Sequence, residues 1–223
     1  MQKSKNTLPI NIDLFVEQAR AEILCSFPDG QNDYSHCIQH TDRVVKMARH
    51  LCRQEGGDYF VISLAALFHD IARSMEDKGE CLDHAKKGAE LTKDILLKHK
   101  VSVDIIGEVV YCIQNHRSDG QGRTLESKIL RDADKLDSLG AICVSRVIAS
   151  SLQSRQYCRP IFDSSIPLSG HETASAVHYL VLLIERYKNN NYFFTKTALN
   201  MAKERVQIME EFVEQFKKEW FFN

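Results

Sequence analysis

The stretch VISLAALFHDIA, residues 61–72, is a nearly unbroken apolar run that contains an adjacent histidine and aspartate. A helix that is apolar on all sides is expected in the interior of a protein, surrounded by other helices. We therefore predict a helix over about 59–72 at the buried centre of the fold, with His69 and Asp70 near its C-terminal end.

Helical spacing also dominates the chain on either side of this run. Only four prolines and ten glycines interrupt the sequence, and the apolar residues between them recur mostly at helical intervals. The pattern predicts an all-α protein, a helical bundle with additional C-terminal helices. The expected helices cover about 12–25, 35–55, 83–99, 103–116 and 125–153 (interrupted near Gly140), followed by an irregular 159–170 and two long helices.

The composition is that of an ordinary globular protein. Of the 223 residues 43% are hydrophobic, and 29 basic side chains against 30 acidic ones leave a formal net charge of −1. These values exclude disordered, collagen-like and coiled-coil classes, and they give no support to a nucleic-acid or membrane partner. The seven cysteines include no CxxC pair, and neither a leader nor a membrane-spanning stretch is recognised. We therefore expect a cytoplasmic protein.

Histidines and aspartates near helix ends carry the chemical information. His69 and Asp70 are adjacent, but alone such a dipeptide is more often a hydrogen-bonded polar pair than a metal site. His40 lies on an earlier predicted helix, and Asp134 interrupts the apolar helical run KILRDADKLDSLGA. The order along the chain is therefore His40, then His69 with Asp70, then Asp134.

This order resembles the H…HD…D signature of the HD superfamily of metal-dependent phosphohydrolases, whose last aspartate stands in an A-D-[RK]-L context. The matching segments are HTDRV (40–44), LAALFHDIAR (64–73) and DADKLDSLGA (132–141). The resemblance extends over about 35–220, and it is to small single-domain bacterial proteins predicted to be HD hydrolases. It implies one HD domain over 1–223, with a metal-binding core at about 35–150 and a helical C-terminal extension at about 171–220.

The resemblance implies that one divalent metal ion is bound by the motif residues His40, His69, Asp70 and Asp134. Imidazole and carboxylate ligands together suit Mn²⁺, Fe²⁺, Ni²⁺ or Zn²⁺. Asp132 is the rival for the last position. Asp134 is preferred because it fills the A-D-K-L position, whereas Asp132 points to the other side of the helix and is given a supporting or helix-capping role.

Two further histidines bear on a second ion. His84, in DHAKKGAEL, begins one predicted helix, and His116, in CIQNHRSDG, ends another. Taken alone, both are best interpreted as exposed helix-terminal histidines. In HD proteins with a dinuclear site, however, two histidines in this order bind the second ion while the motif aspartate bridges. The sequence leaves open whether one ion or two ions bind.

The resemblance also implies a hydrolytic mechanism. A metal-activated water would attack phosphorus in line, while cations neutralise the charge developing on the phosphate oxygens. We predict catalytic roles for Asp70, Arg43 and Lys135. The substrate-binding cations are predicted to be Arg43, Arg73, Arg117 and Lys135. The alternative for these cations is a solvated surface charge.

The expected partner is a small phosphorylated substrate, an ester or an anhydride. A nucleotide is the first choice because several relatives of this size act on nucleotides, some by splitting nucleoside triphosphates into monophosphate and pyrophosphate with Mn²⁺. The sequence contains no motif that recognises a base or a sugar, and no glycine-rich phosphate-binding loop. Two alternatives stay open: a di-iron oxygenase on the same fold, and a non-catalytic nucleotide-sensing domain. Whether two copies pair through the apolar C-terminal helices is also left open.

Overall fold

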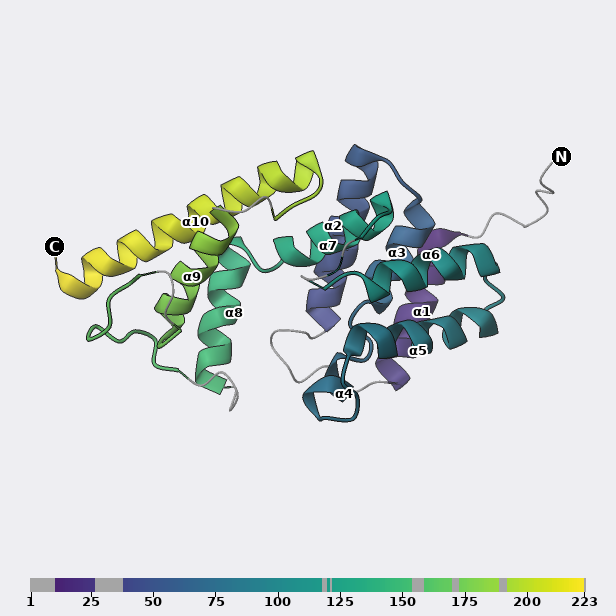
Figure 1. The fold of residues 1–223 in the computed structure, drawn as a ribbon, viewed down its shortest axis with the longest axis horizontal. Coiled ribbons are helices and arrows are strands. Elements are labelled where there is room, and N and C mark those ends of the chain that lie inside the picture. Colours follow the sequence, from purple (N-terminus) through teal and green to yellow (C-terminus); the bar gives the residue numbers. More distant parts are fainter. Residues whose placement is uncertain are drawn as a thin grey trace.

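The computed structural model of the chain describes residues 11–26, 38–117, 120, 122–153, 159–169, 173–188 and 192–222. These residues form helices and no strands, so the predicted all-α class is confirmed (Figure 1). None of these helices is long and apolar enough to cross a membrane. The helices are α1 (Ile12–Ser26), α2 (Ile38–Glu55), α3 (Tyr59–Phe68), α4 (Arg73–Asp77), α5 (His84–Lys98), α6 (Val103–Gln114), α7 (Leu125–Leu136), α8 (Gly140–Gln153), α9 (Ala176–Lys188) and α10 (Lys196–Phe221).

Helix α3 lies at the centre, as the apolar run predicts. The carboxylate of Asp58 caps its first turn by accepting hydrogen bonds from the backbone N–H groups of Phe60 and Val61, and every residue from Phe60 to Phe68 is buried. Helices α2, α6 and α7 pack around it. A helix without a polar face removes its whole side-chain surface from water in this way, and this burial is the main stabilising term of the fold.

Helix α3 ends at Phe68, so the prediction of a helix through residue 72 was wrong. The backbone turns instead: the N–H of Ile71 donates to the carbonyl of Phe68, and the N–H of Arg73 donates to the carbonyl of Asp70. The apolar pattern indicated burial correctly, because Ile71 and Ala72 are buried, but it did not distinguish a buried turn from a buried helix. The short helix α4, which follows this turn, was not predicted.

The remaining predicted boundaries agree with the structure wherever it describes them. The break near Gly140 separates α7 from α8, and Gly140 has a φ of +78° that favours glycine. A Cβ at this position would also lie 3.2 Å from the side chain of Arg205 on α10. The predicted start of the second helix near residue 35 lies outside the described residues.

Helices α8, α9 and α10 form a group at one end of the molecule, and α1, α3, α5 and α6 lie at the other (Figure 1). Helix α10 packs on α8 and α9 and also contacts α2 and α7, which lie between the two ends. The start of α10 is fixed by Asp132 of α7, whose carboxylate accepts hydrogen bonds from the backbone N–H groups of Phe194 and Thr195 and from the Thr195 hydroxyl. The extent of the HD domain over the whole chain stays a prediction.

Candidate metal centre

Six side chains from the ends of five helices meet at one place. Two come from the first turn of α2 and the start of α5, two from the turn after α3, one from just beyond α6 and one from the last turn of α7. Five of the six residues are buried, and the carboxylate of the sixth, Asp70, is only 8% exposed. They are the six predicted metal ligands: His40, His69, Asp70, His84, His116 and Asp134.

The first cluster consists of His40, His69 and Asp134. The Nε2 atom of His40 lies 3.3 Å from that of His69 and 3.5 Å from Oδ1 of Asp134. Asp70 also faces this cluster, since its Oδ2 lies 3.4 Å from Nε2 of His69 and 3.7 Å from Nε2 of His40. Two imidazoles and two carboxylates therefore present nitrogen and oxygen atoms to a common centre.

The second cluster consists of Asp70, His84 and His116. The Nε2 atoms of the two histidines lie 3.3 Å apart, and Oδ1 of Asp70 lies 3.4 Å from that of His84 and 3.6 Å from that of His116. Asp70 thus turns one carboxylate oxygen to each cluster. This is the arrangement expected of a carboxylate that bridges two ions.

Each of the four imidazoles is held by its Nδ1 atom. The Nδ1 partners are carboxylates or carbonyls, which only accept, so Nδ1 carries the proton and Nε2 offers a lone pair to the centre. Ligating histidines in metalloproteins are oriented in the same way. The pairs are His40 with Asp137 at 2.7 Å, His69 with the carbonyl of Ala66 at 2.8 Å, His84 with Glu76 at 2.7 Å and His116 with the carbonyl of Ile113 at 2.6 Å.

The electrostatic field of the first cluster favours positive charge. Burial alone would lower the pKa of His69, but the carboxylates of Asp70 and Asp134 outweigh it and raise that pKa to about 9. Burial would likewise raise the pKa of Asp134, yet Lys135 and the two histidines hold it well below its ordinary value. A centre that attracts a proton so strongly is equally suited to a divalent cation, which competes for the same lone pairs. The donor set therefore fits a metal ion.

The structure shows different positions for Asp134 and Asp132, the two aspartates that competed for the last ligand position in the sequence. Asp134 faces the histidines, whereas Asp132 lies on the other side of α7 and holds the start of α10. Its capping contacts with Phe194 and Thr195 agree with the role given to it from the sequence.

Of the predicted catalytic cations, Lys135 and Arg43 contact carboxylates of this region. The Nζ atom of Lys135 lies 2.7 Å from Oδ2 of Asp134. The guanidinium of Arg43 binds Asp137 in a bidentate manner, with distances of 2.6 and 2.9 Å, and so supports the carboxylate that orients His40. A direct contact of either cation with substrate stays a prediction.

Arg73 and Arg117 lie beside the second cluster. Both pair with Glu76, at 3.2 and 3.1 Å, and Nη1 of Arg73 also lies 3.4 Å from Nδ1 of His84. These arginines therefore surround the carboxylate that orients His84. Their predicted role in binding substrate stays a prediction.

Sequence reasoning missed Asp137 and Glu76, the two carboxylates that orient histidines. Asp137 stands one turn after Asp134 in the same motif, so its spacing was an available signal. Glu76 lies on α4, a five-residue helix without a periodic pattern to reveal it.

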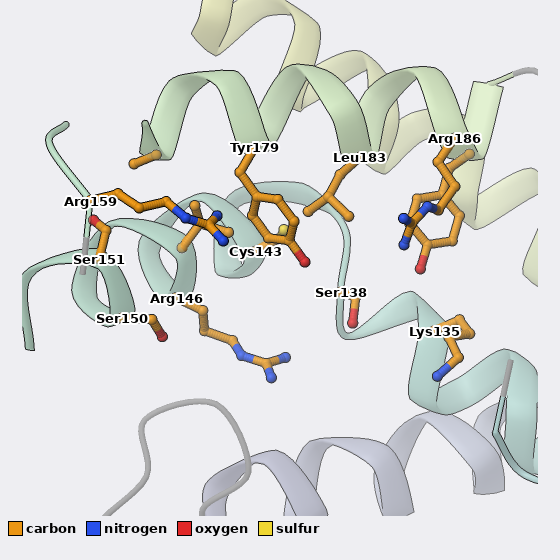
Figure 2. Close-up of a pocket in the computed structure, with 13 residues that line it drawn as sticks. Lys135, Ser138, Cys143, Arg146, Ser150, Ser151, Arg159, Tyr179, Leu183 and Arg186 are labelled. Atoms are coloured by element: carbon orange, nitrogen blue, oxygen red, sulfur yellow. The ribbon is translucent and has the colours of Figure 1, made fainter. Parts of the chain in front are cut away.

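Sequence reasoning also missed a cavity beside the first cluster, of about 270 Å³, between α8 and α9 (Figure 2). We call it the α8–α9 cavity. Figure 2 shows Lys135 of α7 and Arg146 of α8 at its lower side, and Arg159 reaching over Tyr179 of α9.

Comparison with known proteins supports the resemblance drawn from the motifs. Residues 37–139 match the family model of the HD domain. The chain is 25% identical over 209 residues to the uncharacterised protein YpgQ of Bacillus subtilis. The alignment covers 91% of this chain and 92% of YpgQ.

Solved structures with the same fold cover almost the whole chain. A crystal structure of an HD-superfamily hydrolase from Bacillus thuringiensis superposes with a TM-score of 0.74 at 28% identity, covering 96% of this chain and all of the other. The crystal structure of Bacillus subtilis YpgQ in complex with ADP superposes with a TM-score of 0.66 at 21% identity, covering 92% of this chain and 97% of that one.

Proposed function

We propose that this chain, whose residues 37–139 match the HD domain model, is a metal-dependent phosphohydrolase of the HD superfamily that cleaves a phosphate ester or anhydride, with a nucleotide as the first substrate class. The observation that carries the proposal is the position of Asp70, whose two oxygens face the two histidine pairs at 3.4 to 3.7 Å. A buried carboxylate between two pairs of oriented imidazoles is better explained by metal binding than by a role in packing, because burying charge is costly unless it is paired or bound to metal.

The proposed ligands fall into two sets that share Asp70. His40, His69 and Asp134 would hold the first ion with Oδ2 of Asp70, and His84 and His116 would hold a second ion with Oδ1. Nitrogen and carboxylate donors suit Mn²⁺, Fe²⁺, Ni²⁺ or Zn²⁺. Bound here, such an ion would supply a Lewis acid and activate water for attack on phosphorus at neutral pH.

The protein's own groups would orient and neutralise the phosphate. Lys135, which contacts Asp134, lies between the first cluster and the α8–α9 cavity, so its ammonium group is placed to meet a phosphate oxygen at the centre. Asp137 keeps the ring of His40 in one orientation, with Arg43 and Arg146 holding that carboxylate from two sides. Of these groups His40, Asp134 and Asp137 are buried, whereas Lys135, Arg43 and Arg146 are partly exposed.

Support for a nucleotide comes from a relative and from the cavity. YpgQ of Bacillus subtilis has been crystallised with ADP. The α8–α9 cavity, which Lys135 and Arg146 connect to the first cluster, gives a phosphorylated ligand room beside the proposed metal centre.

The test measures metal content and hydrolysis on the same preparation. The purified protein is analysed for bound metal and then assayed with Mn²⁺ against nucleotides and simple phosphoesters for released phosphate or pyrophosphate. We expect turnover that a chelator abolishes and added Mn²⁺ restores. Stoichiometric iron with oxygen consumption and no hydrolysis would instead identify an oxygenase. Bound metal and nucleotide without any reaction would identify a sensing domain.

A further inference from the structure

A second cavity, larger than the α8–α9 cavity, lies between α2 and α10. It has a volume of about 430 Å³, and residues of α2, of the α7–α8 junction and of α10 line it. We call it the α2–α10 groove. It shares no lining residue with the α8–α9 cavity, and its described lining contains none of the six proposed metal ligands. A ligand bound there would therefore not occupy the reacting position at the metal centre.

Three basic side chains of the groove form no ion pair with a carboxylate of the described residues. They are Lys46 and His50 of α2 and Arg205 of α10. The lining also holds Asp137, but Arg43 and Arg146 already bind that carboxylate at 2.6 and 2.7 Å. The groove therefore carries positive charge that the described residues do not neutralise, and such a site attracts an anion.

Arg205 is held in position by its neighbours. Its Cγ atom lies 3.2 Å from the place where a Cβ of Gly140 would stand, so the absence of that Cβ leaves room for the arginine stem. Its Nη1 donates a hydrogen bond to the carbonyl of Leu136. Burial lowers the pKa of Arg205, although Asp137 acts in the opposite direction. An anion beside the guanidinium would stabilise its charged form.

The rest of the groove is mainly apolar. Met47 of α2 and Met201 of α10 are half-buried, while Ile142 of α8 and Ile208 of α10 are 44% and 45% exposed. Apolar side chains that gather in one hollow are stabilised when a ligand covers them and removes them from water. The flexible methionine side chains can adapt to the shape of that ligand.

We propose that the α2–α10 groove binds a small organic anion with an apolar body, of the class of a medium-chain carboxylic acid. Its carboxylate would pair with the basic side chains, and its chain would cover Ile142 and Ile208. A volume of about 430 Å³ lies within the range of about 300–1,000 Å³ typical of sites for whole small molecules. The inference goes beyond the proposed function and does not depend on it.

The test is equilibrium binding by calorimetry, with three probes titrated into the protein as purified and again with a chelator present. Octanoate has the charge and the chain, acetate has only the charge, and 1-octanol has only the chain. We expect octanoate to bind about tenfold or more tightly than either of the others, because its chain buries six further carbons and its carboxylate forms charge-assisted hydrogen bonds. The chelator should leave this affinity unchanged.

Two results with these probes would overturn the inference. Equal affinities for octanoate and 1-octanol would show that the basic side chains do not select an anion. Loss of octanoate binding in the chelator would show that the carboxylate binds to a metal ion instead of the groove.

Variants assign the binding to the groove. Ile208→Glu places a negative charge on the apolar wall and should weaken octanoate binding by about tenfold or more. Its matched control is Leu97→Glu on α5, where the side chain is 46% exposed and lies outside the groove lining. Lys46→Ala removes one cation and should also weaken binding, whereas Lys93→Ala, an exposed lysine of α5, should not.

Circular dichroism checks that each variant is folded, and Lys46→Ala keeps the test decisive if Ile208→Glu fails to fold. Unchanged octanoate affinity in the folded groove variants would overturn the inference. Equal losses in the groove variants and their controls would do the same, because they would show that octanoate binds without a defined site.

Discussion

The two clusters of the candidate metal centre differ in charge. In the part of the chain that the structure describes, the first cluster includes Asp134 and faces Oδ2 of Asp70, whereas the second includes Oδ1 of the shared Asp70 and no second carboxylate. The carboxylates raise the pKa of His69 to about 9, but burial lowers the pKa of His84, and Arg73 adds to that effect. The field at the first cluster therefore attracts cations more strongly than the field at the second.

The carboxylates that orient the histidines, which we call the supports, also differ between the two clusters, and the difference again favours tighter binding at the first cluster. Asp137, which orients His40, is 7% exposed and is bound by two arginines, Arg43 and Arg146. Glu76, which orients His84, is also paired with two arginines, Arg73 and Arg117, but its side chain is 20% exposed. A rigid, buried support holds its ligand more accurately than a partly exposed one. We therefore expect one ion to bind tightly at the first cluster and any second ion to bind more weakly at the second cluster.

The largest effect is expected from Asp70→Ala, because among the described residues Asp70 alone has a carboxylate oxygen facing each cluster. The variant should lose bound metal and should lose activity by more than about a hundredfold, since loss of a ligand exceeds the 10–100-fold cost of losing a ligand's support. Helical content by circular dichroism should be unchanged. Metal analysis and the phosphate-release assay check this, and a variant with full metal content and activity would refute the proposed site.

The next largest effect is a difference in Mn²⁺ binding between a variant of the first cluster and a variant of the second. Asp134→Asn should weaken binding of the first Mn²⁺ by about a hundredfold or more, whereas His116→Ala should leave that first ion in place and weaken only a second one. Activity should fall further in Asp134→Asn if the first ion is the essential one. Calorimetric Mn²⁺ titrations measure both affinities. The reverse order of affinities would show that the second cluster is the tighter one.

A smaller effect is expected at the supports. Asp137→Asn removes the charge that orients His40 and leaves two arginines without their carboxylate, so Mn²⁺ affinity should fall by about 10–100-fold. Glu76→Gln, at the more exposed support, should cost less. The Mn²⁺ affinities of the two variants, measured side by side with the wild type, test this ranking, and an equal loss in both would remove the difference between the supports.

The smallest effect is expected in the alkylation of two buried cysteines, Cys143 on α8 and Cys112 on α6. Burial raises the pKa of Cys143, which lies on α8, and of Cys112, which lies on α6 before His116, to about 12. Both thiols are therefore almost entirely protonated at pH 8, and their reactivity should rise with pH. Alkylation mapped by mass spectrometry should be slow at both sites in the folded protein, and added Mn²⁺ should slow Cys143 more than Cys112. Rapid alkylation of either native thiol at pH 8 would contradict its burial.

The sequence alone predicted the all-α fold and the central helix, because each rests on a local signal, whereas the set of metal ligands came from the resemblance to the HD superfamily, and its metal-binding role stays a prediction. The apolar run identified α3, and the motif order brought His40, His69, Asp70 and Asp134 together. What escaped prediction depends on contacts between distant segments. Glu76 acts through His84 from a five-residue helix, and Arg159 enters the α8–α9 cavity from an irregular segment, so neither carries a periodic or motif signal. Likewise, only the fold shows that Arg43 is held by Asp137, ninety-four residues away in the chain.

The most direct test of the central claim is a Mn²⁺ titration of protein stripped with a chelator, with bound metal and hydrolysis of one phosphorylated substrate measured at each point. We expect the stripped protein to be inactive and hydrolysis to return with the first tightly bound equivalent of Mn²⁺, while the Asp134→Asn variant needs far more Mn²⁺. Hydrolysis that is independent of added metal, or a stripped protein that binds no Mn²⁺, would contradict it.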